Sequence, residues 1–280
     1  MNDRRRQVMD AAHALFVEKG FAAASIQDIL ERSHISKGTF YNYFSSKNEL
    51  LINIFKRINA EANEQRAFIL TGRSVTDHEA FTEQIVASMT IHKENHLFTL
   101  YQGVFISGDE ELKEFVRQQY LEEVKWTQKR IVELYGNDIV PYSLDLALLF
   151  MGNVQQLLHL SAMEEPHIKI EKVIGYALRR LRSAAKDVKS TRDQLISPRF
   201  LEKWFPADEI QREQQRSEIL RAIGAMQKEA DERGRELLAF LQSELIEAEP
   251  RRSVIAAVMQ ALPDRHDLFE RISTYLEKKS

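Results

Sequence analysis

The 280-residue chain has no cysteine, only ten glycines and only six prolines. Without cysteine it forms no disulfide and no thiolate metal site, which fits a reducing compartment. No apolar run reaches the about 18 residues of a membrane span, and the opening MNDRRRQVMD lacks the apolar core of a signal peptide. The share of hydrophobic residues, 44%, and of charged residues, 29%, is that of an ordinary globular protein. We therefore expect a cytoplasmic protein with no membrane partner.

The scarcity of Gly and Pro leaves long stretches without helix breakers. Apolar residues recur at spacings of three and four, and strand-like alternation is rare. This pattern predicts an all-α protein with helices over residues 3–19, 25–32, 36–43, 46–70, 76–92, 95–106, 109–135, 141–163, 168–189, 207–247, 251–262 and 265–278, and a loop at 190–198. Capping boxes predict four of the starts: Ser25 with Asp28, Ser46 with Glu49, Thr76 with Glu79, and Ser107 with Glu110.

Charge is distributed unevenly along the chain. Residues 1–60 carry nine Lys and Arg against six Asp and Glu, whereas residues 61–189 carry 15 against 19 and residues 190–280 carry 15 against 17. A basic N-terminal part on an acidic remainder suggests a polyanionic partner for that part alone.

The segment SHISKGTFYNYF, residues 33–44, places four aromatic residues in five positions. If Ser36 caps a helix, a turn of about 100° per residue brings Phe40 and Phe44 together on the inward face. The outward face then carries the small and polar residues Gly38, Thr39 and Asn42, flanked by Tyr41 and Tyr43. Two short helices joined by a tight turn, braced by a longer first helix, form a helix-turn-helix arrangement.

The outward face suits the major groove of DNA. Gly38 and Thr39 are small enough to let the backbone approach base edges, and Gln27 offers the donor and acceptor pair that matches adenine. Tyrosine hydroxyls, backbone amides and lysines such as Lys37 and Lys47 can bind phosphate oxygens. Similar helix pairs also occur in proteins that never bind DNA, so the residues alone leave this function open.

Residues 4–55 resemble the DNA-binding domain of TetR-family transcriptional regulators. The shared pattern is a basic start, an Ala-rich helix ending in Phe-x-x-x-Gly-Phe, and Ser-x-Gly-Thr-Phe-Tyr-x-Tyr-Phe-x-x-Lys. The resemblance implies that the DNA-contacting positions are Ser25, Gln27, Lys37, Gly38, Thr39, Tyr41, Tyr43 and Lys47. His34 stands in the turn where the family often has Gly or a small residue, and we expect it to alter the turn slightly.

The resemblance also implies a two-fold dimer whose helical body holds a small-molecule pocket, with the last two body helices forming a four-helix dimer contact. The residues agree, because PYSLDLALLFMGNVQQLLHLSAM is apolar on both faces. The helix at 168–189 has one apolar stripe, Val173, Ala177, Leu181, Ala184 and Val188. The two helices would suit an isologous contact.

The expected effector pocket lies between the other body helices. Its candidate lining is mostly apolar with a few polar groups: Phe98, Tyr101, Gln102, Phe105, Tyr120, Val124, Asn153, Gln156 and His159. The alternative is that Asn153, Gln156 and His159 are polar core residues with satisfied hydrogen bonds. No ligand can be named from these residues.

Other chemistry finds little support. His92 and His96 are four apart, but Lys93 follows the first His where a metalloprotease motif needs Glu. There is no phosphate-binding Gly loop, nucleophile elbow or dinucleotide fingerprint. We therefore expect no enzyme, no catalytic residue, no metal and no cofactor.

The sequence thus predicts a helix-turn-helix domain at 1–48, a helical ligand-binding and dimerisation domain at 49–189, and an additional helical extension at 190–280. The predicted function is a repressor that binds a palindromic double-stranded DNA operator as a homodimer and is released by an unknown small-molecule effector. One alternative is a regulator switched by a protein partner through the extension. Another is a helical interaction module or enzyme that does not bind DNA.

Overall fold

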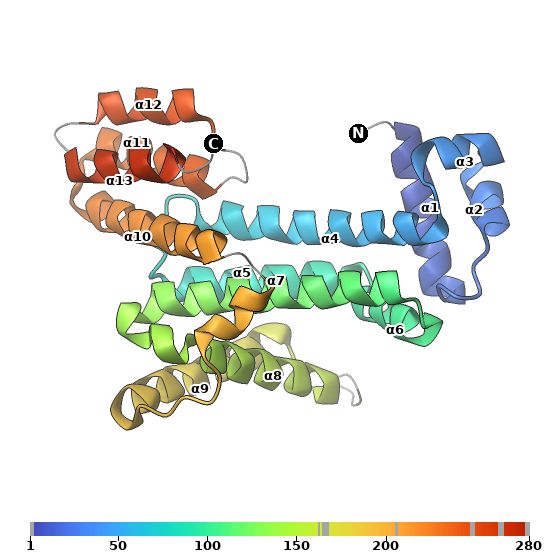
Figure 1. The fold of residues 1–280 in the computed structure, drawn as a ribbon, viewed down its shortest axis with the longest axis horizontal. Helices are drawn as coiled ribbons and strands as arrows, with labels where there is room; N and C mark the ends of the chain where they lie inside the picture. The colour runs from blue at the N-terminus through green and yellow to red at the C-terminus, as the bar shows by residue number, and fades with distance from the viewer. Residues whose placement is uncertain are drawn as a thin grey trace. The chain divides into compact units, whose positions relative to one another are not determined.

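The computed structural model describes residues 3–161, 163, 168–204, 207–246, 250–262 and 266–277, without the side chains of 207–214, 217, 246, 266 and 277. These residues form helices and connecting turns, with no strand among them. The helices, shown in Figure 1, are α1 Asp3–Lys19, α2 Ile26–Ser33, α3 Lys37–Tyr43, α4 Lys47–Leu70, α5 His78–Glu94, α6 Leu97–Ser107, α7 Glu110–Tyr135, α8 Ser143–Ser161, α9 Ile170–Thr191, α10 Ala207–Glu229, α11 Glu232–Ile246, α12 Arg252–Ala261 and α13 His266–Glu277, with 3-10 helices η1 Asn137–Tyr142 and η2 Pro198–Lys203.

The predicted all-α class is confirmed, and most predicted helices lie within two residues of the observed bounds. The single helix predicted over 207–247 is wrong, because the chain breaks between α10 and α11. Asp231 restarts the helix there, since its carboxylate accepts the backbone N–H of Gly234 at 2.8 Å. Part of the predicted loop at 190–198 is also helical, because α9 continues to Thr191 and η2 begins at Pro198.

The capping box at the start of α2 is confirmed. The Asp28 backbone N–H donates to Ser25 Oγ at 3.1 Å, and the Ser25 backbone N–H donates to Asp28 Oδ2 at 2.8 Å. At the start of α4 only half of the predicted box forms. Ser46 Oγ accepts the Glu49 N–H at 3.0 Å, but the Glu49 carboxylate accepts the N–H of Ser45 at 2.6 Å instead of that of Ser46.

The capping boxes predicted at Thr76 and Ser107 are wrong. Asp77 caps α5, with its carboxylate accepting two backbone N–H groups at 2.8 and 3.1 Å. Asp109 caps α7 in the same way at 3.0 Å. In both places a nearby Asp, which is an equally good N-cap residue, competes with the Ser or Thr.

The chain divides into two compact units, and the first comprises Met1–Glu64 and Ala87–Tyr120. Its core joins α1, α2 and α3 to the first part of α4, to α6 and to the start of α7. Phe55 of α4 lies at its centre, with ring centroids 5.0 Å from Tyr101 and 5.9 Å from Phe115. The DNA-binding motif predicted from the sequence is therefore packed against further helices of the same unit.

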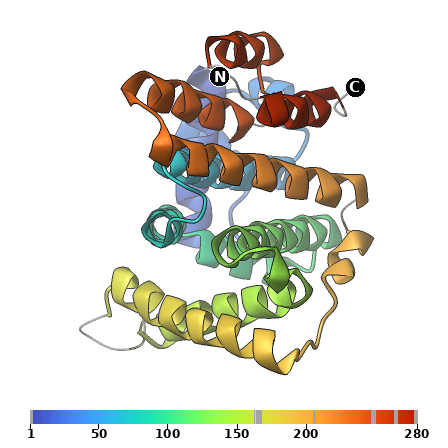
Figure 2. The same ribbon diagram turned by 90° about the vertical axis from the view of Figure 1, so that its left-hand side faces the viewer.

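The second unit comprises Gln65–Val86 and Leu121–Ser280. In it α8 and α9 lie side by side, seen in yellow-green and yellow in Figure 2. Helices α10 to α13 share one apolar core with the α4–α5 turn, which we call the tail cluster; its buried members are Leu70, Val75, Ala80, Ile219, Leu220, Ile223, Leu238, Leu241, Leu245, Ile255, Leu262, Leu268, Ile272, Tyr275 and Leu276. The three-domain division predicted from the sequence is not tested by these units and stays a prediction.

Candidate nucleic-acid interface

The recognition helix α3 rests on buried aromatic rings. Phe40 and Phe44 are almost fully buried, and their ring centroids lie 5.9 Å apart. Ser36 caps the helix, because its Oγ accepts the backbone N–H of Thr39 at 3.1 Å. These contacts explain why so short a helix keeps its conformation: packing and a cap replace the length that an isolated helix needs.

The other face of α3 is open to solvent. Lys37, Gly38 and Tyr41 are exposed, and Thr39 is half-buried. Tyr43 is also half-buried, because its ring packs against the core of the first unit. Two consecutive helices therefore carry five exposed residues of the predicted DNA-contacting set, counting Ser25 and Gln27 at the start of α2.

Hydrogen bonds inside α2 limit what its two predicted residues can do. The Ser25 hydroxyl donates to Asp28 Oδ2 at 2.6 Å, so its only hydrogen is already used by the cap. Gln27 Nε2 donates to Glu31 Oε1 at 2.8 Å, which leaves the second amide hydrogen and the amide oxygen for a base edge. Gln27 thus remains suited to base reading, whereas Ser25 is already engaged as a cap.

Lys47 faces inward, although the family resemblance implies a phosphate contact. Its Nζ donates to the backbone carbonyls of Phe21 and Ala24, both at 2.8 Å, and lies 4.4 Å from the centroid of the Phe21 ring. Burial lowers the pKa of Lys47. The side chain therefore ties the first residue of α4 to the turn between α1 and α2, a role that no local sequence pattern indicates.

The turn between α2 and α3 has a left-handed residue. His34 adopts φ 53° and ψ 41°, and its backbone N–H is directed at carbonyls of the last turn of α2. Gly occupies such positions with least strain, which explains why a small residue suits this turn. His34 is exposed and keeps the same turn at some conformational cost.

Ion pairs support α2 from α1. Arg32 binds both carboxylate oxygens of Glu18, at 2.5 and 2.7 Å, and Lys19 binds Asp28 at 2.8 Å. The bonds from Lys19 and Ser25 hold the pKa of Asp28 well below its usual range. The cap of α2 is therefore charged at neutral pH and fixed to the end of α1.

The basic start of α1 is the part of this surface that the site prediction left out. Arg5 donates to Asn53 Oδ1 at 2.7 Å, and its guanidinium lies 5.0 Å from the centroid of the Phe44 ring. Arg4 and Arg6 are exposed in the same first turn. The signal was present as three consecutive arginines, which entered the prediction as net charge and as the basic start of the family pattern but not as site residues.

The residues predicted to line an effector pocket are divided between the two units. Phe98, Tyr101, Gln102, Phe105 and Tyr120 belong to the first unit, and Val124, Asn153, Gln156 and His159 to the second. Tyr101 is packed on Phe55, and Val124 is buried beside Leu144 and Leu201. Most of the others are exposed, and Asn153 Oδ1 is buried without a hydrogen-bond partner among the described residues. The pocket assignment stays a prediction.

The described residues contain neither a cluster of metal-ligating side chains nor a membrane-spanning helix. No group of three or more His, Asp or Glu side chains there is arranged to hold a metal ion. His92 lies in α5, but His96 follows the end of that helix with φ 50°, so the two do not share one helical face. No described helix is long and apolar enough to cross a membrane.

Comparison with known proteins agrees with this geometry. Residues 8–54 match the family model described as bacterial regulatory proteins, tetR family. YerO, an uncharacterized helix-turn-helix transcriptional regulator of Bacillus subtilis (strain 168), is 24% identical over 280 residues, which is 95% of this chain and 92% of that protein. The transcriptional activator FasR of Mycolicibacterium smegmatis is 39% identical over 56 residues, which is 20% of this chain and 26% of FasR. The transcriptional repressor KstR of the same organism is 34% identical over 65 residues, which is 22% of this chain and 32% of KstR.

The fold has a solved counterpart. The crystal structure of a putative TetR-family regulator from Mesorhizobium loti superposes with a TM-score of 0.51 and 16% identity, covering 65% of this chain and 96% of that one. The fold and the exposed α3 face define a helix-turn-helix DNA-binding regulator. Residues 8–54 carry the signature of the TetR family of bacterial regulatory proteins, and this part of the chain is a TetR-type helix-turn-helix domain.

Proposed function

We propose that the protein is a repressor that binds a palindromic operator as a dimer and is released by a small-molecule effector. The observation that carries this proposal is the exposed face of α3, where Lys37, Gly38 and Tyr41 are held outward on buried Phe40 and Phe44. A small, polar helix face with a fixed base is what insertion into the major groove requires.

The contacts fall into two kinds. Gln27, Gly38 and Thr39 would meet base edges, because they combine an amide with two small residues that allow close approach. The side chains of Lys37, Tyr41 and Tyr43 would bind phosphates and so fix the position of the protein on the duplex. Ser25 and Lys47 could do the same only after release from the internal hydrogen bonds described above.

Exposed apolar residues on α8 support the dimer. Leu149 and Leu160 are 52% and 60% exposed, and with Gly152 and Gln156 they recur at spacings of three and four along one face. The apolar stripe of α9 is used within the chain, since Val173, Ala177 and Leu181 are buried. The dimer contact would therefore rely on the α8 stripe. Leu160→Arg should shift the protein toward monomer in sedimentation equilibrium, while Leu195→Arg, at a position 89% exposed in a loop, should not.

A small-molecule effector would act by binding the DNA-competent and released states with different affinity. We propose the residues named above, from Phe98 to His159, as its first candidates. The relatives include both an activator and a repressor. We propose repression because a dimer seated on a palindrome blocks the DNA that it covers, without a need for further contacts. The buried apolar residues of the extension are enclosed in the tail cluster, which does not favour the alternative of a protein partner docking on them.

Footprinting on the DNA upstream of the protein's own gene tests the proposal. Protection of a palindrome that weakens at higher salt is expected. Reporter transcription from the protected promoter should fall when the protein is present. Protection without symmetry would reject the dimer, increased transcription would reject repression, and equal weak binding to shuffled DNA would reject specific recognition at this site.

A further inference from the structure

The C-terminal extension shares its core with the end of α4. Leu70, the last residue of α4, and Val75 and Ala80 beyond it are buried in the tail cluster together with Leu238 and Leu241 of α11. The α4–α5 turn therefore has no separate core of its own in this unit. Its apolar residues are covered by helices that follow more than 130 positions later in the sequence.

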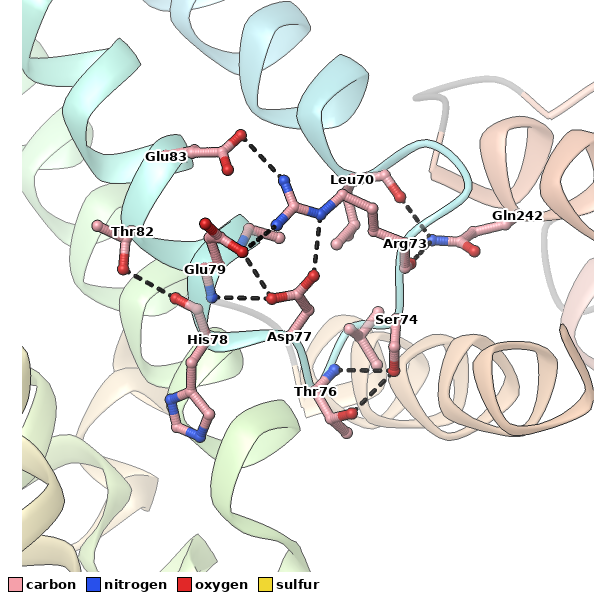
Figure 3. A network of polar contacts seen from close by, with 12 residues as sticks. Leu70, Arg73, Ser74, Thr76, Asp77, His78, Glu79, Thr82, Glu83 and Gln242 are labelled. Atoms are coloured by element: carbon pink, nitrogen blue, oxygen red, sulfur yellow. Dashed lines mark hydrogen bonds and ion pairs between the residues drawn. The ribbon is translucent and has the colours of Figure 1, made fainter. Parts of the chain in front are cut away.

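A single buried side chain of the extension caps α4. Gln242 is fully buried, and its Nε2 donates to the backbone carbonyls of Leu70 at 2.9 Å and Arg73 at 2.7 Å, as Figure 3 shows. Its Oε1 accepts from Gln227 of α10 at 3.1 Å. The Leu70 carbonyl also accepts the backbone N–H of Arg73 at 3.0 Å, so the Gln242 amide gives this carbonyl a second donor and holds both ends of the turn's first residues to the extension.

Helix α10 touches the turn through its backbone. A Cβ placed on Gly224 would lie 3.0 Å from Ser74 Oγ and 3.3 Å from Ser74 Cα. Contacts this short are tighter than most Cβ contacts in proteins and would require Ser74 to shift, so glycine at this position allows α10 to seat on the turn without moving it. A larger residue at 224 would push α10 away from the turn, and with it the α10 members of the tail cluster, Ile219, Leu220 and Ile223.

Hydrogen bonds and ion pairs tie the α4–α5 turn to α5. The Arg73 guanidinium binds Asp77 and Glu83, each at 2.9 Å, and Ser74 Oγ accepts the backbone N–H of Thr76 at 3.2 Å (Figure 3). These bonds link the turn to the first turns of α5. A displacement of α10 would thus shift the end of α4 rather than be absorbed locally.

We propose that the C-terminal extension is a regulatory module that sets operator affinity by holding the C-terminal end of α4. Helix α4 is continuous from Lys47 to Leu70. The first residue of α4, Lys47, donates to the turn between α1 and α2. The carbonyl of its last residue, Leu70, accepts from Gln242 of the extension. One continuous helix therefore carries both the support of the DNA-binding head and the docking point of the extension. This inference rests on the proposed DNA-binding function.

The docked arrangement coexists with a fully capped α2 and α3 and with the Lys47 contacts in place. We therefore assign it to the operator-binding state, and release of the extension lowers affinity for the operator. A ligand or partner that displaces α10 from Ser74 would have the same effect as a mutation that does so.

The test compares Gly224→Leu with Ala225→Leu in the full chain. Position 225 is exposed on the same helix, so its variant adds the same side chain without the clash. Leucine favours a helix more than glycine does, so loss of docking in Gly224→Leu would come from contact with Ser74. Two quantities are measured: amide exchange over residues 70–76, and affinity for the footprinted operator against shuffled DNA.

Gly224→Leu should exchange faster over residues 70–76 and bind the operator at least fivefold more weakly, while Ala225→Leu stays within twofold of wild type. If Gly224→Leu fails to fold, the same two quantities are measured for Gln242→Leu, which removes the hydrogen bonds to Leu70 and Arg73 and keeps a similar side-chain volume. Unchanged exchange, or faster exchange with unchanged operator affinity, would overturn the inference. If wild type shows no operator preference, the proposed function fails as well, and the two failures are thereby distinguished.

Discussion

Neighbouring aromatic residues of α3 have opposite environments. Phe40 is completely buried, whereas Tyr41, the next residue, is 46% exposed. A helical turn of about 100° per residue produces this division, and the types match it, since the buried ring is apolar and the exposed ring carries a hydroxyl. The face of each residue in α3 was therefore predictable from sequence.

Tyr43→Phe tests the phosphate role of a half-buried ring. The change keeps the packing and removes one hydroxyl, so affinity should fall about fivefold on operator and shuffled DNA alike, consistent with a bond worth about 1 kcal/mol. Fluorescence anisotropy on both DNAs measures it. An effect confined to one base position would contradict the assignment.

Gln27→Ala tests base reading at the start of α2. Preference at one base pair should relax by about 1 to 3 kcal/mol, with little change elsewhere in the site. Competition among single-base operator variants provides the measurement. Glu31→Ala, which frees the amide of Gln27, is the matched comparison. An unchanged base preference would remove Gln27 from the reading residues.

His34→Gly tests the left-handed turn. Relief of the positive φ outweighs the extra entropy of glycine in the unfolded chain, so the variant should be more stable by about 0.5 kcal/mol. Urea unfolding measures the difference. A less stable variant would mean that the imidazole contributes more to the turn than its backbone strain costs.

At the scale of elements, local signals predicted helices well and junctions poorly. The Ser25 box was visible because both partners lie within four residues. The internal role of Lys47 was not, because its carbonyl partners lie 26 and 23 positions away. The break between α10 and α11 was masked by apolar residues that continue at helical spacing on both sides of Asp231.

The cap of α2 predicts a response to acid. Because Lys19 and Ser25 lower the pKa of Asp28 in the folded protein, this carboxylate stabilises the head above its unfolded pKa of about 3.9. The contribution is lost as pH falls through the lower folded value. Asp28→Asn should therefore have a lower free energy of unfolding than wild type at pH 7. Its free energy of unfolding, measured with urea, should also change less between pH 5 and pH 3. Equal pH slopes would contradict this role.

At the scale of the whole molecule, the extension could be recognised but not placed from sequence. The sequence predicted helices and apolar seams, and its open alternatives were packing within the protein or docking of a partner. Gln242 contacts carbonyls about 170 residues earlier, and no local pattern encodes such a pairing. The effector pocket shares this difficulty, because its predicted residues are distributed over two units.

The segment before α10 predicts a difference between two truncations. Leu201 is buried with Leu121, Val124 and Leu144, and the Asp145 carboxylate accepts the N–H groups of Leu195 and Ile196 at 2.8 and 3.0 Å. A chain ending at 204 keeps these contacts, and a chain ending at 191 loses them. The shorter chain should be less stable by about 2 to 5 kcal/mol, which thermal unfolding by circular dichroism would detect. Equal midpoints would contradict this packing.

The central claim is that the exposed face of α3 recognises a specific DNA sequence. The most direct test is the ratio of affinities of the full-length protein for the footprinted operator and for shuffled DNA, measured at two salt concentrations. We predict a ratio of at least about 10³, with both affinities falling as salt rises. A ratio near one at both salt concentrations would contradict the account.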